Sequence, residues 1–305
     1  MTAPTTVPVV AHTRDALKAA REALSSRDVA VVMTMGALHD GHARLISAAR
    51  ERHDHVVVTI FLNPLQFGPK EDLSRYPRTF DADLEICTGA GVDVIFAPTP
   101  DVVYPDGDPG VRVSAGPLGE VLEGASRPGH FDGVLTVVGK LLHLTAARSA
   151  YYGQKDAQQL LLIRRMVRDI DFPVDIVSVP TVREDDGLAM SSRNMYLTES
   201  DRETALCLSR ALRAGGDAAA YGPSAIRRAA REVLVEEPLA LVDYLVLVHP
   251  QTLADVPEWY RGEALLAVAA RVGTTRLIDN TPVLVGPGGG ALDVFSDVSH
   301  ARAEV

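Results

Sequence analysis

The sequence predicts an α/β fold in which a doubly wound parallel sheet is followed by a smaller α+β domain. Strand-like and helix-like segments alternate as far as Pro180, and such alternation is typical of a parallel sheet with helices on both faces. Beyond Pro180 the alternation gives way to a long alanine-rich helix and further strand-like runs. We therefore expect one domain over residues 1–181 and a smaller one over 182–305, which ends in a glycine-rich tail.

The strands expected in the first domain are apolar runs rich in β-branched residues, and the helices are amphipathic. In chain order we expect a helix over 13–24, a strand over 29–34, a helix over 41–52, a strand over 55–62, a helix over 81–90 and a strand over 92–97. A loop rich in Pro, Asp and Gly follows over 98–110, and a turn-rich segment continues to 129. The pattern resumes with a helix around 134–142, a strand over 149–152, a helix over 157–169 and a strand over 174–179.

The second domain is predicted from helix-start signals and two strand-like runs. Thr198 and Asp201 have the spacing of a capping box, which opens a helix that reaches about residue 220. A second helix follows Pro223, and the strand-like runs are 242–248 and 264–272. The glycine-rich segment 286–290 is expected to be mobile.

Composition and charge exclude several function classes. The chain has 305 residues, 47% of them hydrophobic, which is enough for a sizeable core. A net charge of −10 disfavours broad binding to nucleic acid, although a local basic pocket for an anion is compatible with it. The sequence contains no apolar run of membrane-spanning length and no signal-peptide pattern at its start. We therefore expect no membrane partner and a cytoplasmic location. Because two cysteines are too few for a disulfide framework, we expect both thiols to be free.

The most informative local segment joins the strand 29–34 to the next helix. The apolar run ends at Gly36, which permits a sharp turn, and Asp40 is expected to cap the helix that Gly41 and His42 begin. His39 and His42 are three positions apart and can share one face of this helix. A helix N-terminus binds phosphate readily. Taken alone, the segment is equally compatible with an ordinary strand-to-helix turn.

Two polar clusters follow other strands of the predicted sheet. Asn63 and Gln66 come directly after the strand 55–62, and Lys155 and Asp156 come after the strand 149–152. Ligands of doubly wound sheets bind at the carboxyl ends of the strands, so these side chains are expected near the two histidines. Taken singly, the first cluster is also compatible with a plain Asn-Pro turn and the second with a solvated helix start.

A third polar cluster lies in a glycine-bearing loop at the expected domain junction. Ser191, Ser192 and Arg193 place two hydroxyls and a guanidinium in succession, which suits a polyphosphate that has to be bound and released. The same composition is common in ordinary loops. The joint placement of all these clusters at one edge of the sheet favours a nucleotide site.

Taken in order, these motifs resemble those of the pantoate–β-alanine ligase family. The resembling segments are 34–42, 63–67, 127–134, 155–159, 186–194 and 273–280. They extend over nearly the whole chain. The first segment alone indicates only the wider HxGH nucleotidyltransferase superfamily, whereas the full ordered set is specific.

The resemblance implies a Rossmann-like first domain and a ligation in two steps. ATP and pantoate would give pantoyl adenylate and pyrophosphate, and the amine of β-alanine would then displace AMP to form the amide of pantothenate. Mg²⁺ would accompany ATP, and a homodimer is expected. Pantoyl adenylate is a reactive mixed anhydride, so the smaller domain is expected to serve as a lid against water.

The resemblance also implies roles for individual residues. Those expected to bind ATP are Met35, Gly36, Ala37, Leu38, His39, Asp40, Gly41, His42, Gly153, Gln154, Lys155, Asp156, Val182, Met190, Ser191, Ser192 and Arg193. Gln66 and Gln159 would hold pantoate, with Gln66 also near β-alanine. His42 and Lys155 would be catalytic, because donors aimed at the phosphates must offset the repulsion between two reacting anions. No protein ligand for a metal is assigned.

Three positions depart from the family pattern. Met33 stands where a proline is usual, and Gln154 replaces a glutamate. Ala82 interrupts a run that is often acidic, so Asp83 is not assigned as a magnesium ligand. None of these positions is an expected catalytic group.

Two alternatives remain at this point. The chain could be another adenylate-forming or nucleotidyl-transferring enzyme of the superfamily, or a nucleotide-binding paralogue without catalysis. The joint presence of His42, Lys155, Gln66 and Gln159 argues against both.

Overall fold

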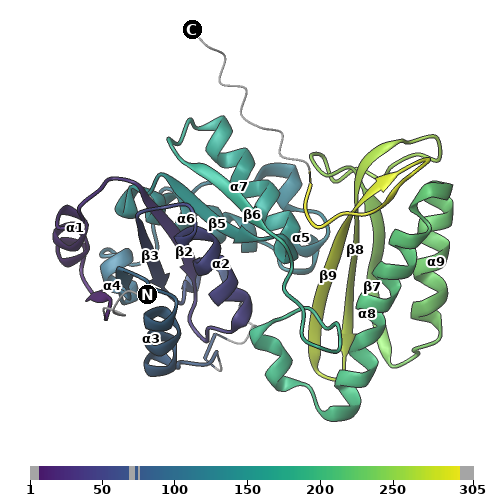
Figure 1. The fold of residues 1–305 in the computed structure, drawn as a ribbon, viewed down its shortest axis with the longest axis horizontal. Coiled ribbons are helices and arrows are strands. Elements are labelled where there is room, and N and C mark those ends of the chain that lie inside the picture. Colours follow the sequence, from purple (N-terminus) through teal and green to yellow (C-terminus); the bar gives the residue numbers. More distant parts are fainter. Residues whose placement is uncertain (1–6, 69–72, 75, 296–305) are drawn as a thin grey trace, which may run out of the picture. The chain divides into compact units, whose positions relative to one another are not determined.

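The computed structural model describes residues 7–68, 73–74 and 76–295 (Figure 1). The chain divides into two compact units, whose boundary in sequence lies between Leu197 and Thr198 rather than at 181/182. The first unit does not end with the strand before Pro180, because the segment that follows Pro180 makes hydrogen bonds to other residues of this unit. The Tyr76 hydroxyl, for example, lies 3.3 Å from Ser192 Oγ.

The first unit contains a parallel sheet, as predicted, but among the described residues it has six strands rather than the five that the sequence indicated, because the strand Val9–Ala11 was missed. Its strands are β1 (Val9–Ala11), β2 (Val29–Thr34), β3 (His55–Ile60), β4 (Val94–Phe96), β5 (Ser149–Gly153) and β6 (Asp175–Val179). Their order is β1-β4-β3-β2-β5-β6, and every neighbouring pair is parallel. The chain builds outward from β2 to β4 and then crosses to β5 on the other side of β2. Ligands of such sheets bind at this crossing point.

Helices cover both faces of this sheet (Figure 1). They are α1 (Arg14–Glu22), α2 (Asp40–Arg50), α3 (Phe80–Gly89), α4 (Pro100–Val103), α5 (Glu123–Ser126), α6 (His130–Thr145) and α7 (Ala157–Asp169). Alternate residues of a strand enter different cores, since successive side chains of a strand point to opposite faces. Val31 of β2 packs in one core with residues of α1, α6 and α7, and Val32 packs in the other with residues of α2 and α3.

Short helical turns connect several of these elements. They are η1 (Pro64–Gln66), η2 (Gly116–Gly119), η3 (Gln154–Asp156) and η4 (Ser192–Tyr196). The segment 98–129, predicted as loop and turns, also contains α4 and α5. Neither of these helices is long enough to show a helical period in the sequence.

The second unit packs two helices with an antiparallel sheet. Its elements are α8 (Glu199–Asp217), η5 (Ala219–Tyr221), α9 (Pro223–Val235), β7 (Ala240–Val248), β8 (Gly262–Val272), β9 (Thr275–Val285) and β10 (Gly290–Ala291). The sheet order is β10-β9-β8-β7. The predicted capping box is confirmed: Thr198 Oγ1 accepts from Asp201 N at 3.1 Å, and the Asp201 carboxylate accepts from Thr198 N at 3.3 Å.

The glycine-rich segment 286–290, which was expected to be mobile, forms a hydrogen-bonded turn that leads into a strand. Gly289 N donates to Gly286 O at 2.7 Å, and the turn returns the chain so that β10 pairs with β9. The last ten residues, 296–305, lie outside the described part of the chain. Within the described part, no helix has the length and apolar character needed to span a membrane.

Candidate active site

A cavity of about 250 Å³ lies at the carboxyl ends of the first unit's strands. The parallel register of the strands produces this arrangement: Thr34 pairs with Ile60, so the segments after β2 and β3 begin at the same edge of the sheet. The predicted site residues that line the cavity are Met35, His39, Gly41, His42, Gln66, Gly153, Lys155, Asp156, Gln159, Val182, Met190, Ser191, Ser192 and Arg193. Sequence segments far apart along the chain therefore contribute to one site.

Five of the predicted ATP-binding residues are not among the lining residues. They are Gly36, Ala37, Leu38, Asp40 and Gln154. Leu38 packs against the core formed with α2 and α3. Gln154 is buried, and its Oε1 accepts a hydrogen bond of 3.1 Å from Ser178 Oγ.

The carboxylate of Asp83 binds the backbone of the turn after β2. Gly36 and Ala37 both have positive φ, +87° and +52°. Asp83 is 1% exposed, and its carboxylate accepts from Ala37 N at 3.1 Å and from Leu38 N at 2.8 Å. Thr79 Oγ1 also lies 3.1 Å from the carboxylate. Asp83 therefore acts as a support for this turn, a role that its place in the first turn of α3 did not reveal.

The helix cap differs from the prediction. The N-cap of α2 is His39, and Asp40 is the first helical residue. His39 Nδ1 accepts from Gly41 N at 3.2 Å, and His42 Nδ1 accepts from His39 N at 3.3 Å. The two imidazole centroids are 4.1 Å apart. The two histidines thus form a reciprocal capping box, in which ring nitrogens replace the usual side-chain oxygens.

This arrangement sets the protonation of both rings. Because each Nδ1 accepts a backbone N–H, each neutral ring carries its proton on Nε2. Burial, with a smaller contribution from His39, lowers the pKa of His42 to about 3. Burial and the nearby Lys155 also lower the pKa of His39. Near neutral pH, His42 is therefore an uncharged N–H donor in the cavity wall.

Gln66 is oriented by its neighbours. Its Oε1 accepts from Asn63 Nδ2 at 3.0 Å, and its Nε2 donates to Met35 Sδ at 3.2 Å. Asn63 is 1% exposed and also bonds to Gly133 O and to the Tyr104 hydroxyl. Asn63 and Gln66 both line the cavity, and the buried Asn63 fixes the side-chain amide of Gln66.

The opposite wall carries Lys155, Asp156 and Gln159. Lys155 Nζ lies 3.6 Å from Asp156 Oδ1. Gln159 follows in the first turns of α7, and its side-chain amide has no hydrogen-bond partner among the described residues. Between these polar groups, α6 contributes an apolar surface formed by Val134, Val137, Val138 and Leu141. The cavity thus combines a cationic part with an apolar part.

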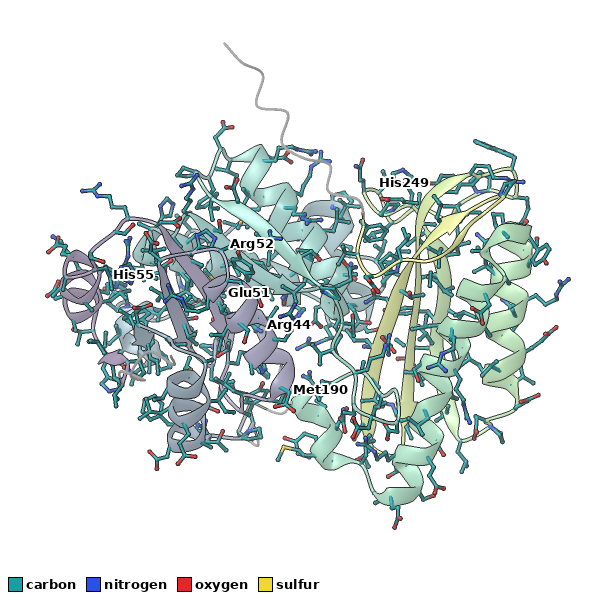
Figure 2. All side chains as sticks on the ribbon, viewed as in Figure 1. Arg44, Glu51, Arg52, His55, Met190 and His249 are labelled. Atoms are coloured by element: carbon teal, nitrogen blue, oxygen red, sulfur yellow. The ribbon has the colours of Figure 1, made fainter. Side chains whose placement is uncertain are left out.

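The loop that contains Ser191, Ser192 and Arg193 is held close to α2. Met190 N donates to Val182 O at 3.0 Å, and Ser191 Oγ accepts from Arg193 N at 3.2 Å. A Cβ placed on Gly41 would lie 3.7 Å from Met190 Cβ. Figure 2 shows Met190 at the end of α2 opposite to Glu51. The hydroxyls and the guanidinium therefore reach the cavity beside the N-terminus of α2.

Sequence reasoning assigned no role to several lining residues. Arg127, His130 and Tyr76 line the cavity together with residues that were predicted. A signal for two of them was present, because Arg127 and His130 lie in one of the resembling segments. Tyr76 lies in no such segment.

Comparison with known proteins shows the family of this chain. The family model described as pantoate-beta-alanine ligase matches residues 6–282. A pantothenate synthetase of Streptomyces avermitilis is 56% identical, over 84% of this chain and 93% of that protein. A pantothenate synthetase of Salinispora arenicola is 59% identical, over 90% of this chain and 98% of that protein.

Solved structures give the same result. A pantothenate synthetase from Thermus thermophilus superposes with a TM-score of 0.84 at 47% identity, covering 89% of this chain and 98% of that one. A pantoate-beta-alanine ligase from Francisella tularensis, complexed with beta-gamma ATP and beta-alanine, gives a TM-score of 0.73 at 34% identity. It covers 90% of this chain and 97% of that one. With the model match, the curated relatives and the folds in agreement, the chain belongs to the pantoate–β-alanine ligase family.

Proposed function

We propose that the cavity is where this ligase condenses pantoate with β-alanine at the expense of ATP. In the first step, a pantoate carboxylate oxygen attacks the α-phosphorus of ATP, and the bond to pyrophosphate breaks. In the second step, the β-alanine nitrogen attacks the acyl carbon of pantoyl adenylate, the bond to AMP breaks, and the amine loses a proton. The products are pantothenate, AMP and pyrophosphate.

One observation carries this proposal: a single cavity combines phosphate-directed donors with side-chain amides. His42, Lys155 and Arg193 line it beside the N-terminus of α2. Gln66 and Gln159 line it as well. The first group suits a triphosphate, and the second suits the hydroxyls and carboxylate of a small acid.

We assign adenylation to the cationic part of the cavity. Attack of one anion on another requires donors placed where negative charge develops. His42 supplies an uncharged N–H from Nε2, and Lys155 supplies a positive charge. Ser191, Ser192 and Arg193 would bind the departing pyrophosphate, and Gly153 and Asp156 the ribose and phosphate. Val182 would meet the adenine through its backbone.

We assign pantoate to the two glutamines and the apolar surface of α6. Gln66 and Gln159 would bond to the polar groups of pantoate, while the valines of α6 would contact its hydrocarbon part. Gln66 would also lie near β-alanine in the second step. Because water would hydrolyse the mixed anhydride, the apolar wall has a protective role.

Mg²⁺ is proposed as a partner of ATP. Among the described residues, no group of three or more His, Cys, Asp or Glu side chains is arranged to hold a metal ion. Asp83 is engaged with backbone N–H groups under the turn. The donor set of the cavity therefore fits an ion that arrives bound to the phosphates, whose charge it partly neutralises.

Three broader expectations remain proposals. ATP dependence supports a cytoplasmic location, and family membership supports a homodimer, which sedimentation equilibrium would test. The lid role of the second unit stays a prediction. Small-angle scattering with and without an ATP analogue and pantoate would test it.

The deciding experiment is an isotope exchange assay. Labelled pyrophosphate should enter ATP only when pantoate is present, and β-alanine should then release AMP in proportion to the amide formed. Other small hydroxy acids serve as controls for the acid substrate. ATP binding without pantoate-dependent exchange would refute the proposed activity.

A further inference from the structure

The main-chain carbonyl of Gln66 is bonded by two side chains, one from Arg127 at the end of α5 and one from His130 at the start of α6. His130 Nδ1 lies 2.8 Å from Gln66 O, and Arg127 Nη2 donates to the same oxygen at 3.3 Å. Arg127 Nη1 lies 3.0 Å from His130 Nε2. The three residues therefore form a closed triangle of hydrogen bonds beside the cavity.

The triangle determines where the protons lie. A carbonyl oxygen only accepts, so His130 Nδ1 carries a hydrogen. A guanidinium only donates, so His130 Nε2 accepts from Arg127. The ring is thus the neutral Nδ1–H tautomer, opposite to the tautomer of His42. Arg127 both bonds to the Gln66 carbonyl and holds His130 in the form that can bond to it.

The backbones of η1 and α6 are also in close contact. A Cβ on Gly133 would lie 2.2 Å from Leu65 O and 2.8 Å from Gln66 N. Asn63 Nδ2, which bonds to the side chain of Gln66, donates to Gly133 O at 3.2 Å. Both the main chain and the side chain of Gln66 are therefore fixed to the first turn of α6.

We propose that Arg127 and His130 are positioning residues for pantoate, which act by fixing the peptide plane and hence the amide direction of Gln66. This inference rests on the proposed function, in which Gln66 binds pantoate. It gives a reason for the spacing of Arg127 and His130, which lets both side chains reach the carbonyl of Gln66. It also predicts that pantoate affinity depends on one particular ring nitrogen.

Substitutions of His130 can separate its two nitrogens. His130→Asn places an amide N–H near the position of Nδ1 and keeps a donor for the Gln66 carbonyl. His130→Gln places its amide near Nε2 and loses that donor, as His130→Ala does. His143, an exposed residue in the last turn of the same helix, provides the control His143→Asn.

The expected result is a selective loss of pantoate binding. In pyrophosphate exchange, His130→Gln and His130→Ala should raise the KM for pantoate by about tenfold to a hundredfold, the range for loss of one hydrogen bond in a charge-assisted network. The KM for ATP should change by less than about threefold. His130→Asn should restore most of the pantoate affinity. Arg127→Met should raise the KM for pantoate even with His130 intact.

Two results would overturn the proposal. One is equal activity in all His130 variants, and the other is a parallel loss of ATP and pantoate binding. Thermal unfolding of each variant identifies simple misfolding. If His130→Ala fails this check, His130→Gln carries the test, because it keeps a polar side chain but loses the donor at the position of Nδ1, and His130→Asn is its matched control. Wild-type exchange without pantoate dependence would refute the proposed function itself, whereas normal wild-type exchange with unaffected variants would refute only this inference.

Discussion

At the residue scale, the main finding is that His42 acts as an uncharged donor. Its Nδ1 accepts from the backbone of His39, so the proton on Nε2 is available to a phosphate oxygen. Loss of one such donor typically lowers the rate by about 10²–10³-fold. We therefore expect His42→Ala to lower kcat for pyrophosphate exchange by about that factor, with a loss of about 1 kcal/mol in stability because the backbone N–H of His39 loses its acceptor. His42→Gln, whose amide can replace Nε2–H, should recover part of the loss; near-normal turnover of His42→Ala would remove the assigned role.

The lowered pKa of His42 also predicts a pH dependence of stability. The folded-state pKa is about 3, below the ordinary value of 6.5, so between these values the unfolded chain binds more protons. Stability is therefore complete above pH 6.5 and falls as the pH drops towards 3, by at most about 1.4 kcal/mol per pH unit from this group. Urea unfolding of wild type and His42→Gln from pH 7 to pH 4 measures this. A constant difference between the two proteins would contradict it.

Asp83 provides a separate test at this scale. Asp83→Asn keeps the size of the side chain. However, its NH₂ group would face one of the two backbone N–H groups that donate to the carboxylate, so one hydrogen bond is replaced by two opposed donors. We expect a loss of about 1–3 kcal/mol in unfolding free energy. We also expect slower exchange of pyrophosphate into ATP. Asp81→Asn, an exposed position in the same first turn, is the matched control. Recovery of the Asp83→Asn rate by excess Mg²⁺ would instead indicate a metal ligand.

The limits of prediction from sequence are clearest for these residues. The spacing of His39 and His42 predicted a phosphate site, because helix geometry follows from spacing alone. The identity of the N-cap of α2 did not follow from the sequence, because aspartate is a commoner N-cap residue than histidine. Only the positions of the two imidazole rings in the structure show that His39 is the cap. The role of Asp83 depends on contacts with residues far away along the chain, to which spacing gives no guide.

At the element scale, prediction succeeded where burial leaves a clear pattern. The run Val29 to Val32 is buried on both faces and gave the bounds of β2 correctly. By contrast, β1 is only three residues long. The strand β9 contains Asp279, Asn280 and Pro282, which are residues depleted in strands. Its pairing with β8 compensates for this local preference.

The contact between α6 and η1 gives the element-scale prediction. Gly133→Ala would place a methyl group 2.2 Å from Leu65 O, so η1 must move and carry Gln66 with it. We expect a raised KM for pantoate and a loss of about 1–3 kcal/mol in stability. Gly139→Ala in the same helix would meet Phe172 at 3.5 Å and should be tolerated. Equal effects of the two substitutions on pantoate binding would show that the close approach at Gly133 is unimportant.

At the scale of the whole molecule, the alternation of elements predicted the fold class, and the ordered motifs predicted the family. The boundary between the two units was harder to predict from the sequence. Pro180 follows the last strand of the parallel sheet, but the chain continues in the first unit to Leu197. The segment after Pro180 stays with the first unit, and it contributes Ser191 to Arg193 to the lining of the cavity.

The two units offer a final prediction, because each contains one buried cysteine. Cys87 lies in the first unit and Cys207 in the second, and both are 0% exposed. Burial raises the thiol pKa to about 12 and about 11, so alkylation requires opening of the unit concerned. All described residues that line the cavity belong to the first unit. A non-hydrolysable ATP analogue at about 100 times its Kd should therefore slow alkylation of Cys87 by about a hundredfold and leave Cys207 nearly unchanged, as mass spectrometry of each peptide would show. Equal protection of both thiols would mean that the two units open together or that both hold the nucleotide.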